Sequence, residues 1–333
     1  MVKLAIDAMG GDFAPEEIIK GVNLSIEEHK DLELILYGDE EQIKKYLVPN
    51  KRVTIVHTPR VISMGEADPR REIRNNKDTS LVQAFTAIKE NLAEGVVTAG
   101  PTQAVVVSAH IVLRRMKGMS RMALCLGLPD LGDGKQRLLL DSGANLELKP
   151  EHLVQLAEYA TIYMKEVMGV EKPVVGLLNI GTEEAKGREF DIEAFHLLKD
   201  NKNITFFGNI EPKEMLASPC DILVTDGYTG NMVMKTAEGV AIAVGKLLKQ
   251  GIMASSKAKF GYLFMKGVFK ELKNKTTADS IGGAILIGAD GIVIKAHGSS
   301  NGPSFQAAIS LARRAVLGNV NEKMKAIIGD KDE

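Results

Sequence analysis

The sequence predicts an α/β fold, in which a doubly wound, mainly parallel sheet lies between two layers of helices. Two observations carry this prediction. Short apolar runs rich in Val, Ile and Leu alternate along the chain with longer segments of helical spacing. Many of these runs end in a turn of Gly, Asp, Asn, Ser or Thr, as strands do where they lead into the next helix of an α/β protein.

Each element has a local reason. A predicted strand is a short apolar run bounded by turn residues, and a predicted helix repeats its apolar residues every three or four positions. The predicted strands are 4–9, 32–37, 53–57, 96–99, 138–141, 174–179, 204–207, 222–225 and 292–296. The predicted helices are 16–29, 40–47, 79–93, 104–116, 152–168, 190–199, 232–251 and 304–317.

Length and composition indicate a globular protein with a large core. The chain has 333 residues, of which 45% are hydrophobic and 26% are charged, and its formal net charge is −1. We expect a single large α/β unit over 1–333, with 246–275 protruding from it. The small net charge gives no global attraction for nucleic acid, so no nucleic-acid partner is expected.

Three features bear on the compartment. Cys125 and Cys220 stand inside apolar runs and are interpreted as small core residues of a reducing compartment. The N-terminus is interpreted as a first strand and not as a signal peptide. The long uncharged stretch 95–113 contains Pro101 and His110, so it is interpreted as strand, turn and buried helix and not as a membrane span. We therefore expect a cytoplasmic protein.

Two charged regions break the alternation of strands and helices. Region 61–77 carries many charges and Pro69. It fits a long loop or short helix over a site, and equally a solvated surface excursion. Region 246–275 holds eight lysines against one acid, Glu271, with many apolar and aromatic residues between them, which makes it a basic amphipathic segment.

The basic segment 246–275 allows two interpretations. It forms a helical hairpin that buries its apolar side against the body or a second subunit, or it makes reversible contact with an anionic membrane surface. Both hold if a dimer presents the tip of the hairpin to lipid. The residues expected at the dimer or membrane contact are Phe260, Leu263 and Phe264.

Six predicted strand ends are rich in glycine and small polar residues. They are 7–12 (DAMGGD), 99–102 (AGPT), 141–145 (DSGAN), 179–183 (NIGTE), 226–231 (DGYTGN) and 295–300 (KAHGSS). Glycine lets backbone amides approach a ligand closely, and Ser, Thr and Asn add neutral donors. Together they predict a crevice at the carboxyl edge of a sheet, suited to phosphate or carboxylate.

Several motifs are absent from the sequence. It contains no Walker A pattern, no Gly-x-Gly-x-x-Gly after the first strand, no Gly-x-Ser-x-Gly elbow and no His-x4-Asp acyltransferase signature. No Cys/His cluster has metal spacing, so neither a metal nor a cofactor is expected. His297, beside Lys295 and before a Gly-Ser-Ser turn, is the histidine best placed for chemistry, and Lys186 follows a strand end.

With these motifs in order, the chain resembles the bacterial phosphate acyltransferases of phospholipid synthesis, the PlsX family. The resemblance covers essentially the whole length. It rests on 7–12 (DAMGGD), 138–145 (LLLDSGAN), 176–183 (GLLNIGTE), 224–231 (VTDGYTGN), the pair Gly282-Gly283, and 295–300 (KAHGSS). It implies a fold like that of the isocitrate and isopropylmalate dehydrogenases and the phosphotransacetylases, and it implies a homodimer.

The resemblance also implies an activity and its partners. A long-chain fatty acyl group would pass from acyl carrier protein to inorganic phosphate, and a membrane glycerol-3-phosphate acyltransferase would use the acyl phosphate for phospholipid synthesis. The chain departs from the family at Pro101 and Gln103, where the pattern Ala-Gly-Asn-Thr-Gly-Ala is expected. It departs again at Asn76-Lys77, where the family has two lysines.

This chemistry requires no covalent acyl-enzyme, because phosphate is already anionic and a thiolate is a good leaving group. We expect Lys186 to supply charge, His297 to donate to the oxyanion or protonate the thiol, and Asp226 to orient one of these two cations. The residues expected to bind phosphate or substrate are Gly10, Gly11, Asn145, Thr182, Gly230, Asn231 and Ser299. The hairpin and the exposed cations Arg114, Arg115 and Lys117 are the expected contacts of the acidic carrier protein.

Two other functions remain open at this point. A short-chain phosphotransacetylase acting on coenzyme A thioesters shares the chemistry, although the apolar hairpin favours a long acyl chain. A non-catalytic membrane scaffold for lipid enzymes would explain the hairpin alone, but it would not need six glycine-rich strand ends. A metal-dependent hydroxyacid dehydrogenase of related fold would need clustered acidic ligands that the sequence does not show.

Overall fold

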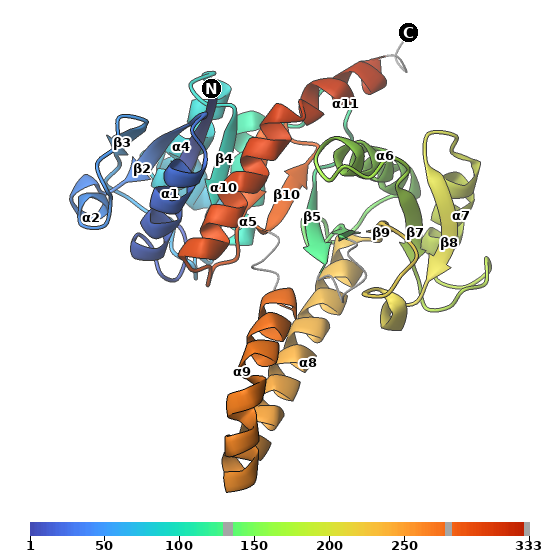
Figure 1. Ribbon diagram of the computed structural model, residues 1–333. Helices are drawn as coiled ribbons and strands as arrows, with labels where there is room; N and C mark the ends of the chain where they lie inside the picture. Colours follow the sequence, from blue (N-terminus) through green and yellow to red (C-terminus); the bar gives the residue numbers. More distant parts are fainter. Residues whose placement is uncertain (129–135, 277–281, 330–333) are drawn as a thin grey trace.

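The computed structural model describes residues 1–128, 136–276 and 282–329, and they form one sheet of eleven strands between helices (Figure 1). The strand order is β3-β2-β1-β4-β11-β10-β5-β6-β9-β7-β8. The strands are β1 Val2–Asp7, β2 Leu32–Gly38, β3 Val53–His57, β4 Gly95–Thr98, β5 Ala123–Leu128, β6 Arg137–Leu140, β7 Val174–Leu178, β8 Thr205–Ile210, β9 Ile222–Val224, β10 Ala284–Ile287 and β11 Ile292–Lys295.

The sheet consists of two parallel halves that run in opposite directions. Strands β3, β2, β1, β4 and β11 are parallel to one another, and so are β6, β9, β7 and β8. Between the halves, β10 and β5 are antiparallel to each other and to their outer neighbours. These three successive antiparallel pairings reverse the strand direction between the two halves.

Helices cover both faces of the sheet. They are α1 Glu16–Glu28, α2 Glu40–Lys44, α3 Pro69–Asn75, α4 Ser80–Lys89, α5 Thr102–Ser108, the π-helix η1 Ala109–Leu113, α6 Pro150–Glu166, α7 Glu189–Asp200, the 3-10 helix η2 Pro212–Glu214, α8 Gly227–Ala254, α9 Ser256–Thr276, α10 Gly302–Leu317 and α11 Val320–Gly329. Helices α1, α6, α7, α10 and α11 bury their apolar residues on one face. On the other face lie α4, α5 and η1, together with the beginning of α8.

Side chains of each strand alternate between these two layers, as the pleat requires. In β1, Leu4 and Ile6 belong to the core under α1 and α10, whereas Ala5 belongs to the core under α4 and α5. In β9, Ile222 faces the α6 side and Leu223 faces the beginning of α8. The predicted three-layer, doubly wound α/β architecture is confirmed.

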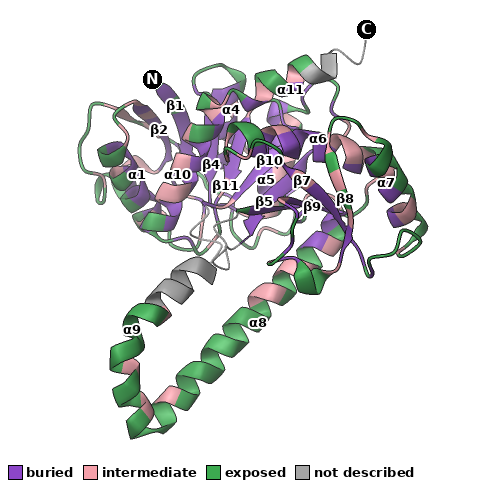
Figure 2. Cartoon of the chain, turned by 45° about the vertical axis from the view of Figure 1, so that its right-hand side comes forward, coloured by how far each residue is buried: buried purple, intermediate pink, exposed green. Residues whose placement is uncertain are grey.

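Helices α8 and α9 project from the body as an arm (Figure 1). Asp226 caps α8 by accepting a hydrogen bond from the Thr229 amide, and the helix then continues for 28 residues. The break comes at Ser255, whose backbone is extended. Beyond the body, most residues of both helices are exposed (Figure 2). The side chains of Lys270, Lys273 and Lys275, part of the predicted basic segment, lie outside the described ones.

Sequence patterns miss two strands, β5 and β10. Both are short apolar runs without the alternation or the polar end that identifies the other strands. They are also the two strands at the reversal of the sheet, so the reversal is missed with them. Cys125 and Cys220 are buried core residues, as predicted. No helix among the described residues is long and apolar enough to cross a membrane.

Candidate active site

The ends of β1, β4 and β11 form a first group of polar turns. The Asp12 amide donates a hydrogen bond to the Gly298 carbonyl oxygen over 2.8 Å, which ties the turn after β1 to the turn after β11. The buried Asp7 carboxylate accepts a hydrogen bond of 2.7 Å from the Thr98 hydroxyl of β4. Burial raises the pKa of Asp7, against the lowering effect of its hydrogen bonds. These contacts fix the three turns against one another.

Glycine is required where the turn after β1 meets the turns after β4 and β11. Gly11 has φ +118, and a Cβ there would lie 3.2 Å from the Gly298 oxygen. A Cβ on Gly10 would collide with the Asp7 carboxylate and approach the Gly100 amide to 2.8 Å. The turn after β1 therefore presents bare backbone, as an anion site needs. The binding role of Gly10 and Gly11 stays a prediction.

His297 and Ser299 are exposed at the end of β11. The His297 Nδ1 lies 2.8 Å from the Ser299 hydroxyl and 3.3 Å from the Ser299 amide nitrogen. Because an amide N–H only donates, Nδ1 accepts in this geometry and a neutral ring carries its proton on Nε2. His297 thus has a hydrogen-bond donor available at the ring edge away from Ser299. Met64, from region 61–77, reaches this group, because a Cβ on Gly298 would lie 2.7 Å from its Cε.

The ends of β6, β7 and β9 form the second group. The Asp141 carboxylate accepts hydrogen bonds from four backbone amides, those of Leu124, Gly143, Ala144 and Asn145. Burial raises the pKa of Asp141, and these amides act in the opposite direction. The Asn145 side-chain amide donates to Asp141 and to the Met122 carbonyl oxygen. Both of its hydrogens are therefore committed to holding the turn, and only its oxygen remains for a ligand.

Asp226 pairs with an arginine that sequence reasoning missed. Its Oδ2 lies 2.5 Å from Arg188 Nη2, and it accepts further hydrogen bonds from the Thr229 amide and hydroxyl. Arg188 also forms a two-pronged contact with Asp191, through Nε and Nη2. Sequence reasoning gave Lys186 or His297 as the cation that Asp226 orients, and the structure gives Arg188 instead. A cation directly after Gly187, near a strand end, was the available signal.

The pKa of Asp226 reflects this pairing. Burial alone would raise it, but the Thr229 amide, Arg188 and the Thr229 hydroxyl outweigh burial and hold the pKa below its usual value. Conversely, Asp191 and then Asp226 raise the pKa of the Arg188 guanidinium. The Arg188 side chain is nevertheless 55% exposed, against 5% for Asp226. Two carboxylates thus hold the permanently charged guanidinium of Arg188 at the exposed side of the second group of turns.

The remaining predicted residues lie around this pair. Thr182 and Lys186 are exposed on the loop after β7, and the Lys186 carbonyl accepts from Asn179 over 2.9 Å. Gly230 is buried against the Asp141 backbone, where a Cβ would collide. Asn231 lies beside Gly143. The turn 226–231 therefore packs directly on the turn 141–145, as two walls of one site.

The six turns follow strands of opposite direction, three in each half of the sheet. The predicted crevice therefore has to bring the ends of both halves together, and it stays a prediction. Among the described residues, no hydrogen bond or ion pair joins His297 to Lys186 or Asp226. Pro101 precedes α5, and the Gly100 amide beside it is used by the Thr98 hydroxyl, so this turn offers few free donors.

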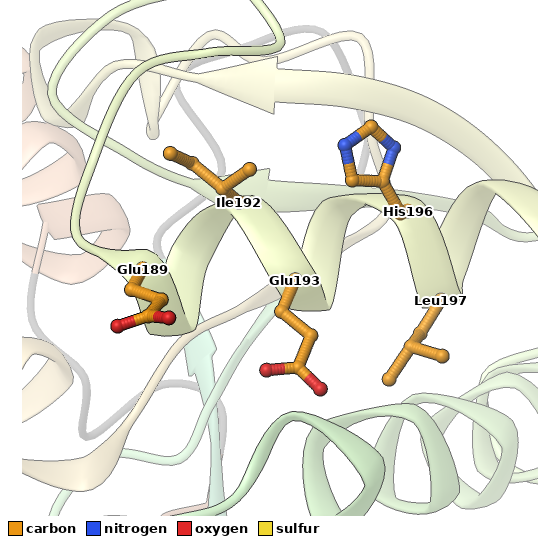
Figure 3. A pocket seen from close by; sticks show the side chains of 5 residues that line it. All are labelled: Glu189, Ile192, Glu193, His196 and Leu197. Carbon is orange, nitrogen blue, oxygen red and sulfur yellow. The ribbon is translucent and has the colours of Figure 1, made fainter.

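A shallow depression on α7 is separate from both groups. Glu189, Ile192, Glu193, His196 and Leu197 line it, all from one stripe of the helix (Figure 3). It is open and holds no side chain of the strand-end turns. No group of three or more His, Cys, Asp or Glu residues in the described part of the chain is arranged to hold a metal ion.

These features define a class of protein. It is an α/β protein whose glycine-rich strand ends have lysine, arginine and histidine beside them, the setting in which proteins of this class commonly bind anions.

Comparison with known proteins gives the family. A family model described as "Fatty acid synthesis protein" matches residues 2–323. The "Phosphate acyltransferase" of Acholeplasma laidlawii is 46% identical over the full length of both chains, and that of Staphylococcus aureus is 43% identical over the full length of both. The chain belongs to this phosphate acyltransferase family of fatty acid synthesis proteins, as its motifs predict.

Solved structures support the fold. A phosphotransacetylase from Streptococcus pyogenes superposes with a TM-score of 0.62 at 15% identity, over 94% of each chain. At this identity the likeness concerns the fold alone. The predicted similarity to the phosphotransacetylases in architecture is confirmed.

The Asp226–Arg188 pair predicts a specific acid sensitivity. A carboxylate with a lowered folded-state pKa stabilises the protein above its unfolded pKa, near 3.9, and loses this contribution as the pH falls through the folded value. Asp226→Asn should lower the free energy of unfolding by about 1–3 kcal/mol at neutral pH. Urea unfolding should show that this difference shrinks as the pH falls from about 5 to about 2.

The matched control is Glu184→Gln, which removes an exposed carboxylate that pairs with Lys199. Its acid dependence should follow that of the parent protein. If Asp226→Asn keeps the same stability deficit at every pH, the ion pair is not its cause.

Proposed function

We propose that this protein transfers a fatty acyl group from the thioester of acyl carrier protein to inorganic phosphate, giving acyl phosphate for phospholipid synthesis. Acyl transfer to phosphate follows from the family and from relatives named phosphate acyltransferase. The observation in the molecule that carries the proposal is the pair of glycine-rich walls, 141–145 and 226–231, with exposed cations beside them. The proposal goes further than the family does in two respects: it names acyl carrier protein as the donor, and it names a long acyl chain as the group that is transferred.

The reaction requires the protein mainly to position the two substrates and to supply positive charge. Hydrogen phosphate is a nucleophile near neutral pH, and the thiolate of the carrier leaves readily. The site must hold phosphate against the thioester carbonyl and stabilise the tetrahedral oxyanion. Backbone amides and fixed cations do both, so neither a cofactor nor a metal enters this mechanism.

The residues divide into roles on this proposal. Thr182, Gly230 and Asn231 bind phosphate, with Lys186 supplying charge. The contacts found for Asp226 change its proposed role from orienting Lys186 or His297 to orienting Arg188. His297, with its donor on Nε2, stabilises the oxyanion of the acyl group. Gly10, Gly11, Asn145 and Ser299 complete the substrate contacts.

One assay tests the reaction and separates it from its rivals. The protein is incubated with palmitoyl carrier protein and phosphate, and acyl phosphate is trapped with hydroxylamine. Palmitoyl hydroxamate is expected. The same assay with acetyl coenzyme A should give little product, because a two-carbon chain loses the apolar contacts of a long one. Preference for acetyl coenzyme A would indicate a short-chain phosphotransacetylase. If neither thioester gives a product, the non-catalytic scaffold is the remaining function.

Lys186→Ala and His297→Ala should each lower turnover by about 10²–10³-fold at saturating phosphate, because each removes a group that stabilises developing charge. Hydroxamate formation measures the effect, and circular dichroism verifies the fold. The control is Lys172→Ala, an exposed lysine before β7 that should leave turnover unchanged. Full turnover in both folded variants would overturn the assigned roles.

A basic surface beside β5 suits the acidic carrier protein. Arg114, Arg115 and Lys117 are exposed there. Arg115 also acts on a neighbouring side chain, since burial and then the positive charges of Arg115 and Arg121 lower the pKa of His110. Complementary charge steers association and favours the correct partner. We therefore assign carrier docking to this surface, with the α8–α9 arm as the second expected contact.

Charge reversal tests the docking surface. Arg114→Glu with Arg115→Glu should lower kcat/KM for palmitoyl carrier protein by about tenfold or more, because like charges then face each other. The kcat/KM for palmitoyl coenzyme A serves as the internal reference and should change much less. Equal losses for the two donors, or none, would remove these arginines from the interface.

The arm carries more exposed apolar surface than a solvated helix pair needs. Phe260, Leu263 and Phe264 are 65%, 66% and 78% exposed, and Val240, Ile242 and Leu247 of α8 are exposed as well. Such a surface marks an interaction site. We assign it to a homodimer contact along the arm and to reversible contact of its tip with an anionic membrane. A cytoplasmic enzyme would thereby deliver acyl phosphate to a membrane glycerol-3-phosphate acyltransferase.

Liposome flotation tests the membrane contact. A variant with Phe260, Leu263 and Phe264 replaced by serine should lose most of its binding to anionic vesicles, because each apolar side chain contributes about 1.5–3 kcal/mol when buried. Neutral vesicles should bind the parent protein more weakly, since the lysines of the arm then lack partners. Undiminished flotation of the folded variant on anionic vesicles would refute this contact.

A further inference from the structure

Lys295 occupies the boundary between the two halves of the sheet. It ends β11, where it is paired with Thr98 of β4 on one side and Ala284 of β10 on the other. Alternation along the strand places its side chain on the face of Val293, which is the face that also carries the beginning of α8. It therefore lies at the end of the first group and is turned toward the helix that leaves the second.

The environment of Lys295 is costly for an ammonium group. The side chain is partly buried, and its one hydrogen bond within the described part of the chain runs from Nζ to the Ala296 carbonyl oxygen over 2.8 Å. No carboxylate among the described residues lies within ion-pair distance of it. A buried ammonium without a paired anion is unfavourable. This placement contributes nothing evident to stability, which points to a use in the reaction.

Few groups face this amine, and their charges are known. Asp12 approaches from the turn after β1, and Lys235 and Glu238 approach from α8, while Thr98 and Ala284 do not titrate. Burial first and the charge of Lys235 second lower the pKa of Lys295 to about 8, against the opposing effects of Asp12 and Glu238. Near neutral pH the group is therefore an ammonium that gives up its proton readily.

We propose that Lys295 is a catalytic residue whose ammonium protonates the sulfur of the departing thiol during acyl transfer to phosphate. This inference rests on the proposed function. It also separates two roles that sequence reasoning left together on His297. The histidine, exposed and with a donor on Nε2, serves the oxyanion, and the half-buried lysine serves the leaving group.

The proton balance of the step closes without another reactant. A phosphate oxygen attacks the thioester carbonyl carbon, and the C–O bond forms as the carbonyl electrons move to oxygen. When the tetrahedral intermediate collapses, the C–S bond breaks and its electron pair goes to sulfur, which takes a proton from Lys295. Hydrogen phosphate enters with one proton that acyl phosphate does not keep. The neutral amine takes up that proton, and Lys295 is restored.

The parent enzyme provides the first test, through its dependence on the leaving group. Palmitoyl carrier protein releases an alkyl thiol, which needs a proton as it leaves. S-palmitoyl thiophenol releases an aromatic thiolate, which is stable without one. The kcat for the carrier substrate should fall above a pH of about 8, where Lys295 loses its proton. The kcat for the aromatic thioester should show no such fall.

Substitutions provide the second test. Lys295→Met, and Lys295→Arg, which keeps the charge but does not release a proton near neutral pH, should lower kcat for palmitoyl carrier protein by about 10²–10⁴-fold. With S-palmitoyl thiophenol both losses should shrink to less than about tenfold. Lys235→Met is the neighbouring control. Removing its charge raises the pKa of Lys295, so the alkaline fall should move to higher pH and not disappear.

The outcomes separate this inference from the proposed function. If the parent enzyme forms acyl phosphate from both thioesters with the same alkaline fall, the role of Lys295 is overturned and the proposed function stands. Equal losses for both thioesters in the Lys295 variants overturn it likewise. If the parent forms acyl phosphate from neither thioester, the proposed function fails and the role of Lys295 fails with it.

Discussion

The reversal of strand direction at β10 and β5 determines how the polar turns are distributed over the sheet. A sheet of one direction would gather all its carboxyl ends at one edge, as the doubly wound rule describes. Here the antiparallel pair separates two parallel halves of opposite direction, and each half contributes three polar turns. A reaction that needs both groups must then use an element that reaches from one to the other. Helix α8 begins in the second group, and Lys235 and Glu238 on it influence Lys295 in the first.

Buried carboxylates form the framework of these turns, and the cations lie outside it. Asp7 holds the turn after β1 to β4, Asp141 collects four backbone amides, and Asp226 fixes Arg188. An exposed carboxylate in such a site would repel phosphate, but a carboxylate saturated by amides or by a guanidinium shapes the backbone and orients a positive group. These carboxylates therefore shape the backbone and orient the cation of the proposed anion site, and they do not contact the anion themselves.

The sequence was sufficient for the architecture and for the identity of the turns, because periodicity and glycine-rich strand ends are local signals. The sequence did not predict strands β5 and β10, because a short apolar run such as 284–287 carries no local signal of strand direction or of pairing. The partner of Asp226 escaped it for a related reason. Arg188 and Asp226 are far apart along the chain, and only the adjacency of β7 and β9 brings them together. The chemistry of His297 depends on its hydrogen bonds with Ser299, which spacing alone could not assign.

One continuous helix connects the turn 226–231 to the tip of the arm. Helix α8 starts at Gly227, within the wall that packs on Asp141, and runs 28 residues before its first break. At 1.5 Å per residue this is a spacer of about 42 Å. If the proposed contact of the tip with a bilayer holds, this length limits how far the turn 226–231 lies from the lipid. A product with a long apolar tail would then have only a short and fixed distance to cross through water.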